Sequence, residues 1–166
     1  MKPNQIIIPK AKKTSMLLPN FKAITWKGII YCKKQSDVDS INQNDYVDTI
    51  LKAHETIHIR QAYAMNNSWT KFYLNYMLQY IKNIPLITIN INAPYKLIPT
   101  EIEAYLNQDN LQYPSENKPL TQWKYFQKNL KLKDKKQIAK LYYKNNIQHL
   151  SYTSILINFL KQKQNL

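Results

Sequence analysis

Glycine is nearly absent from this sequence of 166 residues, in which Gly28 is the only one. Nucleotide-binding proteins use several closely spaced glycines, because only glycine lets the backbone approach the phosphates closely. The sequence therefore argues against a nucleotide-binding function. Lys, Asn, Ile, Gln and Tyr are abundant instead, a composition that favours helices joined by turns of proline and asparagine.

Cysteine is equally rare, with Cys32 alone in the chain. One cysteine cannot form an intramolecular disulfide, and no cysteine cluster is present to hold a structural zinc ion. We therefore expect a reducing compartment.

Long apolar runs are missing as well. The run Ile6–Ile8 is too short for the hydrophobic part of a signal peptide and is followed by Pro9. The segment from Asn83 to Tyr95 has little charge, but prolines and asparagines interrupt it, so it cannot span a bilayer. We expect no signal peptide, no transmembrane segment, and a cytoplasmic location.

Acidic residues are scarce, since ten Asp and Glu stand against 24 Lys and Arg and leave a formal net charge of +14. A charge of this sign attracts anionic partners, such as nucleic acid or an acidic protein surface, to the Lys-rich termini. Aromatic residues lie among the C-terminal lysines, namely Trp123, Tyr125, Phe126, Tyr142 and Tyr143. Nucleic-acid binding is therefore one hypothesis, and a solvated face on two amphipathic helices is its alternative.

The length favours one domain with its own hydrophobic core. Residues 1–20, with three prolines among lysines, are expected to form an irregular or extended basic arm, and residues 21–166 the single domain. The predicted fold class is mainly α with a minor β element (α+β). We predict one or two strands within 23–32 and a loop or short helix start at 35–48. Helices are predicted at 47–66, 68–83, 100–111 and 120–132, with a non-helical segment at 86–91. A last helix is predicted from 134 to the C-terminus, broken near 145–146.

The predicted helix at 68–83 has a capping serine, Ser68, and an aromatic face. The periodicity predicts that this face packs inward. Its members are Trp69, Phe72, Tyr73, Tyr76, Met77, Tyr80 and Ile81.

The predicted helix at 47–66 contains the segment His54-Glu55-Thr56-Ile57-His58. Two histidines four residues apart on a helix are rotated by about 40° and lie about one turn apart, so both imidazoles can bind one metal ion. A glutamate directly after the first histidine can accept a hydrogen bond from a metal-bound water. The pattern predicts a zinc site with Glu55 as general base.

Chance is a weak explanation for the motif. With three histidines and four glutamates in the chain, an accidental match is expected in roughly one such sequence in a thousand. The alternative interpretation is a pair of hydrogen-bonded core histidines beside a surface glutamate.

A catalytic zinc ion needs a third protein ligand. Glu101 and Glu103 are the downstream candidates, and His149 is a third. Thr100 and Glu103 stand in the capping-box relation, which gives Glu103 a structural task and favours Glu101 as the ligand.

These residues resemble gluzincin-type metallopeptidases, in which a helical HExxH is followed by a glutamate in a Glu-x-x-Ala-Asp/Asn pattern on a second helix. Residues 101–104 match its start, and Tyr105 stands where an acid or amide is usual. More closely, the chain resembles short, mostly uncharacterised bacterial and phage HExxH proteins. In these a hydrophobic strand precedes the motif, while a Phe-Tyr-x-x-Tyr helix and an Ile-x-x-Glu-x-Glu-Ala-Tyr segment follow it, as at residues 24–31, 72–76 and 98–105.

The resemblance implies a compact zincin-like helical domain with zinc held by His54, His58 and Glu101, and with Glu55 as base. Since Tyr105 departs from the pattern, Asn107 or Asp109 could orient a ligating histidine.

A zinc-dependent peptidase acting on a peptide or protein substrate is therefore the leading hypothesis. A structural, virion-associated protein that keeps the metallopeptidase-like fold within a larger assembly is the second. A basic nucleic-acid-binding protein is the third.

Overall fold

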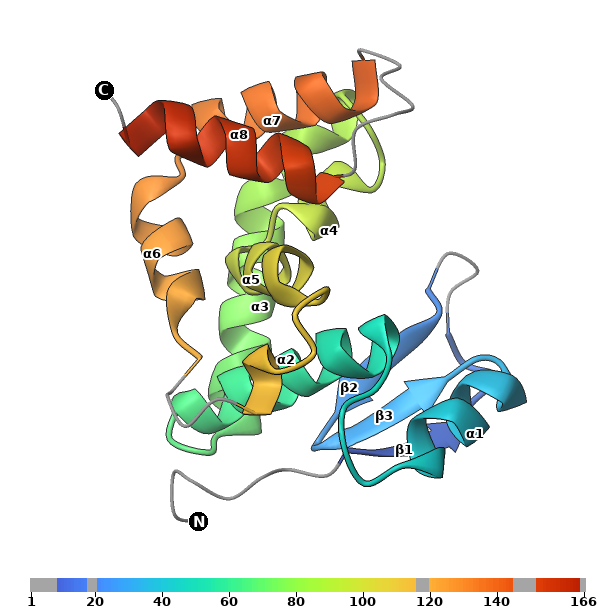
Figure 1. The fold of residues 1–166 in the computed structure, drawn as a ribbon. Helices are drawn as coiled ribbons and strands as arrows, with labels where there is room; N and C mark the ends of the chain where they lie inside the picture. The colour runs from blue at the N-terminus through green and yellow to red at the C-terminus, as the bar shows by residue number, and fades with distance from the viewer. Residues whose placement is uncertain (1–8, 18–20, 116–119, 145–151, 165–166) are drawn as a thin grey trace. The chain divides into compact units, whose positions relative to one another are not determined.

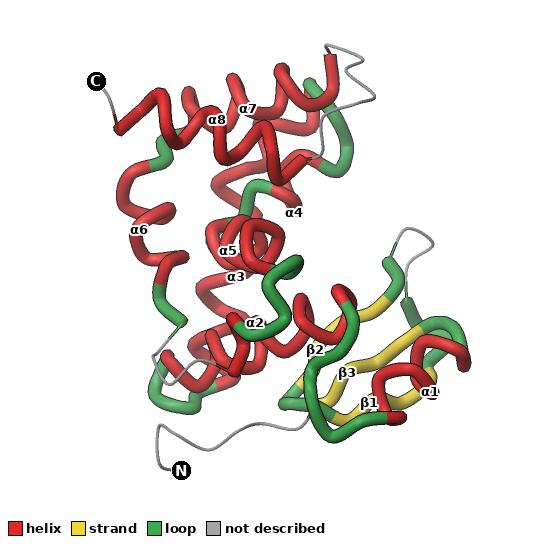
Figure 2. Tube along the Cα trace, in the orientation of Figure 1, coloured by secondary structure: helices red, strands yellow, loops and turns green. Residues whose placement is uncertain are grey.

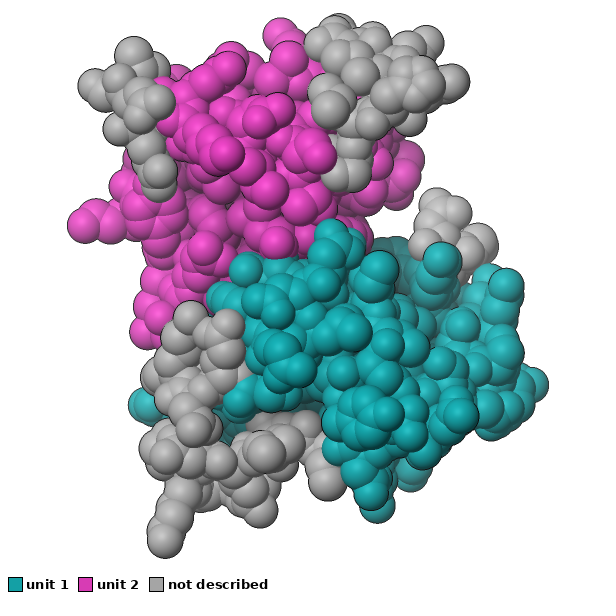
Figure 3. Space-filling view, viewed as in Figure 1, with its two compact units in different colours: residues 1–72, 107–120 teal, residues 73–106, 121–166 magenta. Residues whose placement is uncertain are grey.

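The computed structural model describes residues 9–17, 21–115, 120–144 and 152–164 (Figure 1). The chain divides into two compact units (Figure 3): unit 1 comprises Met1–Phe72 and Asn107–Leu120, and unit 2 comprises Tyr73–Leu106 and Thr121–Leu166. Helices dominate, with one small sheet of three strands (Figure 2), so the predicted mainly α fold with a minor β element is confirmed. Lys10–Lys13, within the predicted basic arm of residues 1–20, form a strand that pairs with β3 (Ile29–Cys32), so this part of the arm belongs to unit 1. The division does not test whether each unit folds alone, so a single domain stays a prediction.

Unit 1 contains the sheet, with strands β1 (Lys10–Lys13), β2 (Ala23–Trp26) and β3 (Ile29–Cys32) in the order β1-β3-β2. Strand β1 runs parallel to β3, and β2 runs antiparallel to it. Lys27 and Gly28 join β2 to β3 with positive φ values of 47° and 82°. A two-residue hairpin with both φ positive needs glycine or another tolerant residue, which explains where the only glycine lies.

One face of this sheet is buried. Helix α1 (Gln35–Gln43) packs against β1 and β3, and helix α2 (Ile50–Ala64) packs against β2. The residue range of α1 had been predicted to be a loop or a short helix start. Its Asn42 side chain exchanges two hydrogen bonds with the backbone of Ala11, of 2.8 and 3.0 Å. This amide pairs with the outer edge of β1 as a neighbouring strand would.

Helix α2 confirms the helix predicted over residues 47–66. The Thr49 side chain caps its first turn by accepting a hydrogen bond from the Lys52 amide at 3.2 Å. The helix ends at Ala64 with Met65 as its C-cap residue, and Asn66 and Asn67 follow with φ of 62° and 57°. Asparagine is one of the few residues besides glycine that adopt this left-handed conformation readily.

Helix α3 (Trp69–Asn83) follows Ser68, whose hydroxyl accepts a hydrogen bond from the Lys71 amide at 3.3 Å. The predicted inward face is wrong in part. Phe72 is buried, but Met77 and Ile81 are each 50% exposed. Apolar side chains occupy most of the helix circumference, so periodicity cannot identify the face that packs inward.

In the described residues of unit 2 the regular elements are all helices, and the unit has its own core. Its further elements are the 3-10 helix η1 (Ile84–Thr88), α4 (Ala93–Lys96), α5 (Pro99–Asn107), α6 (Gln122–Asn129), α7 (Leu132–Lys144) and α8 (Tyr152–Gln164), whereas the 3-10 helix η2 (Tyr113–Ser115) belongs to unit 1. Apolar side chains from η1 and α4 to α8 form the core, among them Leu86, Ile102, Phe126, Ile138 and Leu156.

Three element predictions in unit 2 need correction or fall outside the described residues. The segment 86–91, predicted to be non-helical, is helical over 86–88, because η1 begins two residues earlier with Pro85 in its first turn, where proline is tolerated. Helix α5 ends at Asn107, four residues before its predicted end. The break expected at 145–146, and His149 with it, lie outside the described residues.

The aromatic residues between the C-terminal lysines lie mainly in the interior. Trp123 and Phe126 are buried, and Tyr142 and Tyr143 pack against the core of unit 2. Tyr125, at 45% exposure, is the one of the five with a large exposed surface. Base stacking on this region would therefore depend on Tyr125.

None of the helices in the described residues is long and apolar enough to cross a lipid bilayer.

Candidate metal centre

Helix α2 is buried on all sides although much of it is polar. Every residue from Lys52 to Ala62 is buried. Polar groups cost free energy when they leave water, unless they form hydrogen bonds or bind a metal ion. A helix that buries two histidines, a glutamate and a glutamine is therefore an expected location for chemistry.

His54 and His58 lie one turn apart on this helix, with their Nε2 atoms 3.3 Å apart and their rings at 81° to one another. Two nitrogens that bind one tetrahedral zinc ion at about 2.0 to 2.1 Å are about 3.3 to 3.4 Å apart. The separation within the pair is therefore the one that a tetrahedral metal ion requires.

Each imidazole is oriented through its other nitrogen. The Nδ1 of His54 lies 2.9 Å from the Oε1 of Gln108, and the Nδ1 of His58 lies 2.9 Å from the Oε1 of Gln61. An amide oxygen only accepts hydrogen bonds, so each Nδ1 is the donor. The tautomer with hydrogen on Nδ1 leaves the Nε2 lone pair to bind a metal ion.

Glu55 points towards the sheet of unit 1. The Thr25 hydroxyl on β2 donates a hydrogen bond of 2.6 Å to Glu55 Oε2. The carboxylate is almost wholly buried. The alternative of a surface glutamate beside core histidines therefore does not describe Glu55.

Cys32 is buried on β3 and does not join the histidines as a sulfur ligand. Burial, together with the negative charges of Glu55 and Asp37, raises the pKa of its thiol to about 12. The thiolate is the form that binds metals and reacts with electrophiles. The thiol therefore stays protonated at neutral pH.

Glu101 belongs to unit 2, where it is buried on α5. The Tyr76 hydroxyl on α3 donates a hydrogen bond of 2.9 Å to its Oε1. Tyr152 is buried, and burial, followed by the charges of nearby groups that include Glu101, raises its pKa well above the usual value. Its hydroxyl, which donates to the Lys96 carbonyl oxygen at 2.6 Å, is therefore protonated.

Glu103 has a different task from the one that the capping-box pattern predicted. Its two carboxylate oxygens accept hydrogen bonds from the backbone amides of Gln122 and Trp123, at 3.1 and 3.2 Å. These are the first two residues of α6, whose amide groups have no partner within the helix. Glu103 thus stabilises the start of a different helix from its own.

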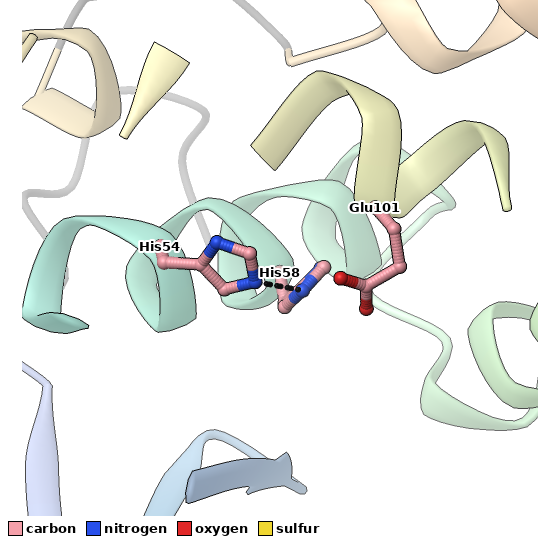
Figure 4. A group of neighbouring side chains, drawn as sticks. All are labelled: His54, His58 and Glu101. Carbon is pink, nitrogen blue, oxygen red and sulfur yellow. Dashed lines mark hydrogen bonds between the residues drawn. The ribbon is translucent and has the colours of Figure 1, made fainter. Parts of the chain in front are cut away.

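His54, His58 and Glu101 each offer one ligand atom and form a group that could hold a metal ion. Figure 4 shows the two imidazoles projecting from one helix and the carboxylate from another. It is the one such group of His, Cys, Asp and Glu in the part of the chain that the structure describes. Because the histidines come from unit 1 and Glu101 from unit 2, we treat Glu101 as a proposed ligand.

The hydrogen-bond partners of these four residues were not predicted. Gln108 takes the contact with His54, and it lies between the two candidates Asn107 and Asp109. Gln61, at three residues from His58 on the same helix, could have been found from its spacing. Thr25 and Tyr76 lie in the segments 24–31 and 72–76 that accompany the motif, but the sequence does not assign them these contacts.

No protein-family model, curated protein or solved structure matches this chain. The likeness to gluzincin-type metallopeptidases therefore rests on the short motifs alone. The function has to be argued from these residues and their geometry.

Proposed function

We propose that this chain binds one zinc ion through His54, His58 and Glu101 and hydrolyses peptide bonds with Glu55 as general base. The observation that carries the proposal is the histidine pair, with Nε2 atoms 3.3 Å apart and each Nδ1 bound to a glutamine oxygen. This arrangement brings two nitrogen lone pairs to one point, where a cation relieves their mutual repulsion.

The donor set fits zinc. Two imidazoles and one carboxylate form the ligand set of one class of catalytic zinc sites, which keep a fourth position open for water or substrate. Hard cations such as magnesium and calcium prefer oxygen ligands. When bound, zinc would polarise the substrate carbonyl and bring the pKa of a water molecule near 7.

Glu55 is the residue to which we assign proton transfer. Thr25 holds its Oε2, so Oε1 is the atom that would accept a proton from the attacking water. The same atom would then return the proton to the nitrogen of the leaving amine as the peptide bond breaks. Burial of the carboxylate keeps bulk water from competing for that proton.

The substitution Glu55→Gln tests the assignment of the base. It keeps the size of the side chain and an acceptor for Thr25 but removes the proton-accepting carboxylate. We expect about one zinc per chain to be retained, and peptide hydrolysis to fall by about a hundredfold or more. Hydrolysis at the wild-type rate would show that Glu55 is not the base.

Metal analysis of wild type, Glu101→Ala and Glu103→Ala tests the third ligand. We expect Glu101→Ala to lose zinc. Glu103→Ala should keep zinc but unfold more easily, because α6 loses two accepted amide hydrogen bonds. Full zinc content in folded Glu101→Ala would remove Glu101 from the site.

A structural or virion-associated role remains the alternative prediction. A chain that binds zinc through these ligands but cleaves no peptide or protein substrate, in wild type and Glu55→Gln alike, would support that role over peptidase activity.

A further inference from the structure

The outer face of α3 is apolar where a surface helix is normally polar. Leu74, Met77, Leu78 and Ile81 are 49, 50, 52 and 50% exposed. At about 100° per residue they lie within an arc of about 100°, on the opposite side of the helix from Phe72, Gln79 and Asn83. Those three are buried, so the helix turns two polar side chains inward and four aliphatic ones outward.

The exposed apolar surface continues beyond the helix. Ile84 and Ile87 in η1 and Ile91 after it are exposed, as is Tyr80. In the described residues, half of the exposed large hydrophobic side chains lie between residues 74 and 91. We call this surface the outer face and define it by Leu74, Met77, Leu78, Tyr80, Ile81, Ile84, Ile87 and Ile91. Such clusters mark interaction surfaces, whereas single exposed apolar residues do not.

The charged residues in the part of the sequence that contains the outer face are all positive. No acidic residue occurs between Glu55 and Glu101 in the sequence. Lys71 and Lys82 are exposed on α3 and, by helical spacing, border the outer face beside Leu78. The segments that make up unit 2 contain twelve lysines against three acidic residues, a formal net charge of +9.

We propose that the outer face binds peripherally to the surface of an anionic phospholipid bilayer. Helices that lie in a membrane interface combine an apolar face with flanking lysines, and bind through apolar burial together with attraction to anionic lipids. The outer face has both features. A second copy of the chain would bring like charges together, which disfavours self-association through this face.

Co-sedimentation with vesicles tests this binding. The probe is phosphatidylcholine vesicles with about 30 mol% phosphatidylserine, compared with pure phosphatidylcholine. We expect the full chain to sediment with the mixed vesicles, to stay in solution with the neutral ones, and to be released as salt rises.

Three sets of substitutions distinguish binding through the outer face from attraction of the basic chain as a whole. Leu74→Gln, Leu78→Gln and Ile81→Gln together should lower vesicle binding by about tenfold or more. The matched control combines Tyr125→Gln, Leu132→Gln and Ile157→Gln, three exposed residues elsewhere in unit 2, and should change binding by less than about twofold. Lys71→Gln with Lys82→Gln should weaken binding to the mixed vesicles by about tenfold or more.

A fluorescence measurement keeps the proposal testable if the triple variant does not fold. Leu78→Cys and Ile157→Cys are each labelled with an environment-sensitive fluorophore, since the buried, protonated Cys32 should not react. We expect a blue shift with mixed vesicles at position 78 and none at position 157.

Three results would overturn the proposal. The wild type could fail to bind the mixed vesicles. The folded triple variant could bind as tightly as wild type, which would assign binding to lysines alone. Finally, wild type could form a dimer that the triple variant abolishes, without vesicle binding, which would show that a second copy covers the outer face.

Discussion

Helices α2 and α3 are both 15 residues long, but α2 buries polar side chains whereas α3 exposes apolar ones. In α2 the charged and polar residues Lys52, His54, Glu55, His58 and Gln61 are buried. In α3 aliphatic residues are half-exposed. Hydropathy alone would predict the reverse arrangement for both helices.

The difference shows that the buried polar groups of α2 and the exposed apolar groups of α3 are accompanied by different kinds of neighbour. The buried groups of α2 have polar partners: the ammonium group of Lys52 donates to the Asn44 carbonyl oxygen at 2.6 Å, and Thr25 holds Glu55. The exposed aliphatic residues of α3 have flanking lysines instead. In the two proposals made above, α2 carries the metal ligands and the base, and α3 carries the membrane-binding face.

The largest effect expected from this comparison is on the free energy of unfolding, when isoleucine is replaced at one position on each helix. Ile57 on α2 is fully buried, whereas Ile81 on α3 is 50% exposed. We expect Ile57→Ala to lower the free energy of unfolding by about 2 to 5 kcal/mol. Ile81→Ala should change it by less than about 0.5 kcal/mol, because that side chain packs little.

Urea denaturation of both variants measures this difference. Equal destabilisation of the two would mean that the outer face of α3 is packed in solution, and would break the comparison.

A smaller effect on zinc affinity is expected to distinguish two buried glutamines, one on each helix. Gln61 on α2 holds His58 in the metal-binding tautomer, whereas Gln79 is buried on α3. We expect Gln61→Leu to weaken zinc binding by about tenfold to a hundredfold, and Gln79→Leu to leave zinc affinity unchanged. Competition with a chelator of known affinity measures both. Equal affinities for Gln61→Leu and wild type would show that the amide does not orient the ligand.

The smallest effect concerns the buried end of α3. Asn83 Oδ1 accepts a hydrogen bond of 2.8 Å from the ammonium group of Lys135, and burial, helped by the nearby charge of Lys82, lowers the pKa of Lys135 to about 8. The unfolded chain therefore holds this proton more tightly than the folded chain. Stability should rise between pH 7 and pH 9, by about 1 kcal/mol from this group.

The control for this pH dependence is Lys135→Met, which has no proton to lose and should show a rise smaller by that amount. Denaturant titrations at both pH values measure it, and they should stay below pH 10 because tyrosines ionise above it. A parallel rise in both proteins would rule out Lys135 as its source.

Local features of the chain were predictable from sequence. The motif helix, the serine start of α3 and the hairpin around Gly28 follow from capping, periodicity and the conformational freedom of glycine. The inward face of α3 did not follow, because two of its faces are apolar. The first turn of η1 did not follow either, because proline disfavours a helix interior but is tolerated in a first turn.

In the candidate site, too, the local residues were predictable from sequence and the distant ones were not. His54, Glu55 and His58 are one local pattern and were found. Thr25 and Gln108 contact them from 30 and 54 residues away in sequence, and only tertiary folding brings such residues together. At Glu103 the capping-box pattern predicts a contact within the helix that contains it. The carboxylate instead accepts hydrogen bonds from the first two backbone amides of α6.

X-ray absorption of the zinc-loaded chain tests the central claim most directly, because it reports the atoms bound to the metal. The account predicts one zinc per chain with nitrogen and oxygen ligands at about 2.0 to 2.1 Å, two of them imidazoles, and no sulfur at about 2.3 Å. The imidazole signal should fall in His58→Ala. A sulfur ligand, or a spectrum that His58→Ala leaves unchanged, would contradict a site built on His54 and His58.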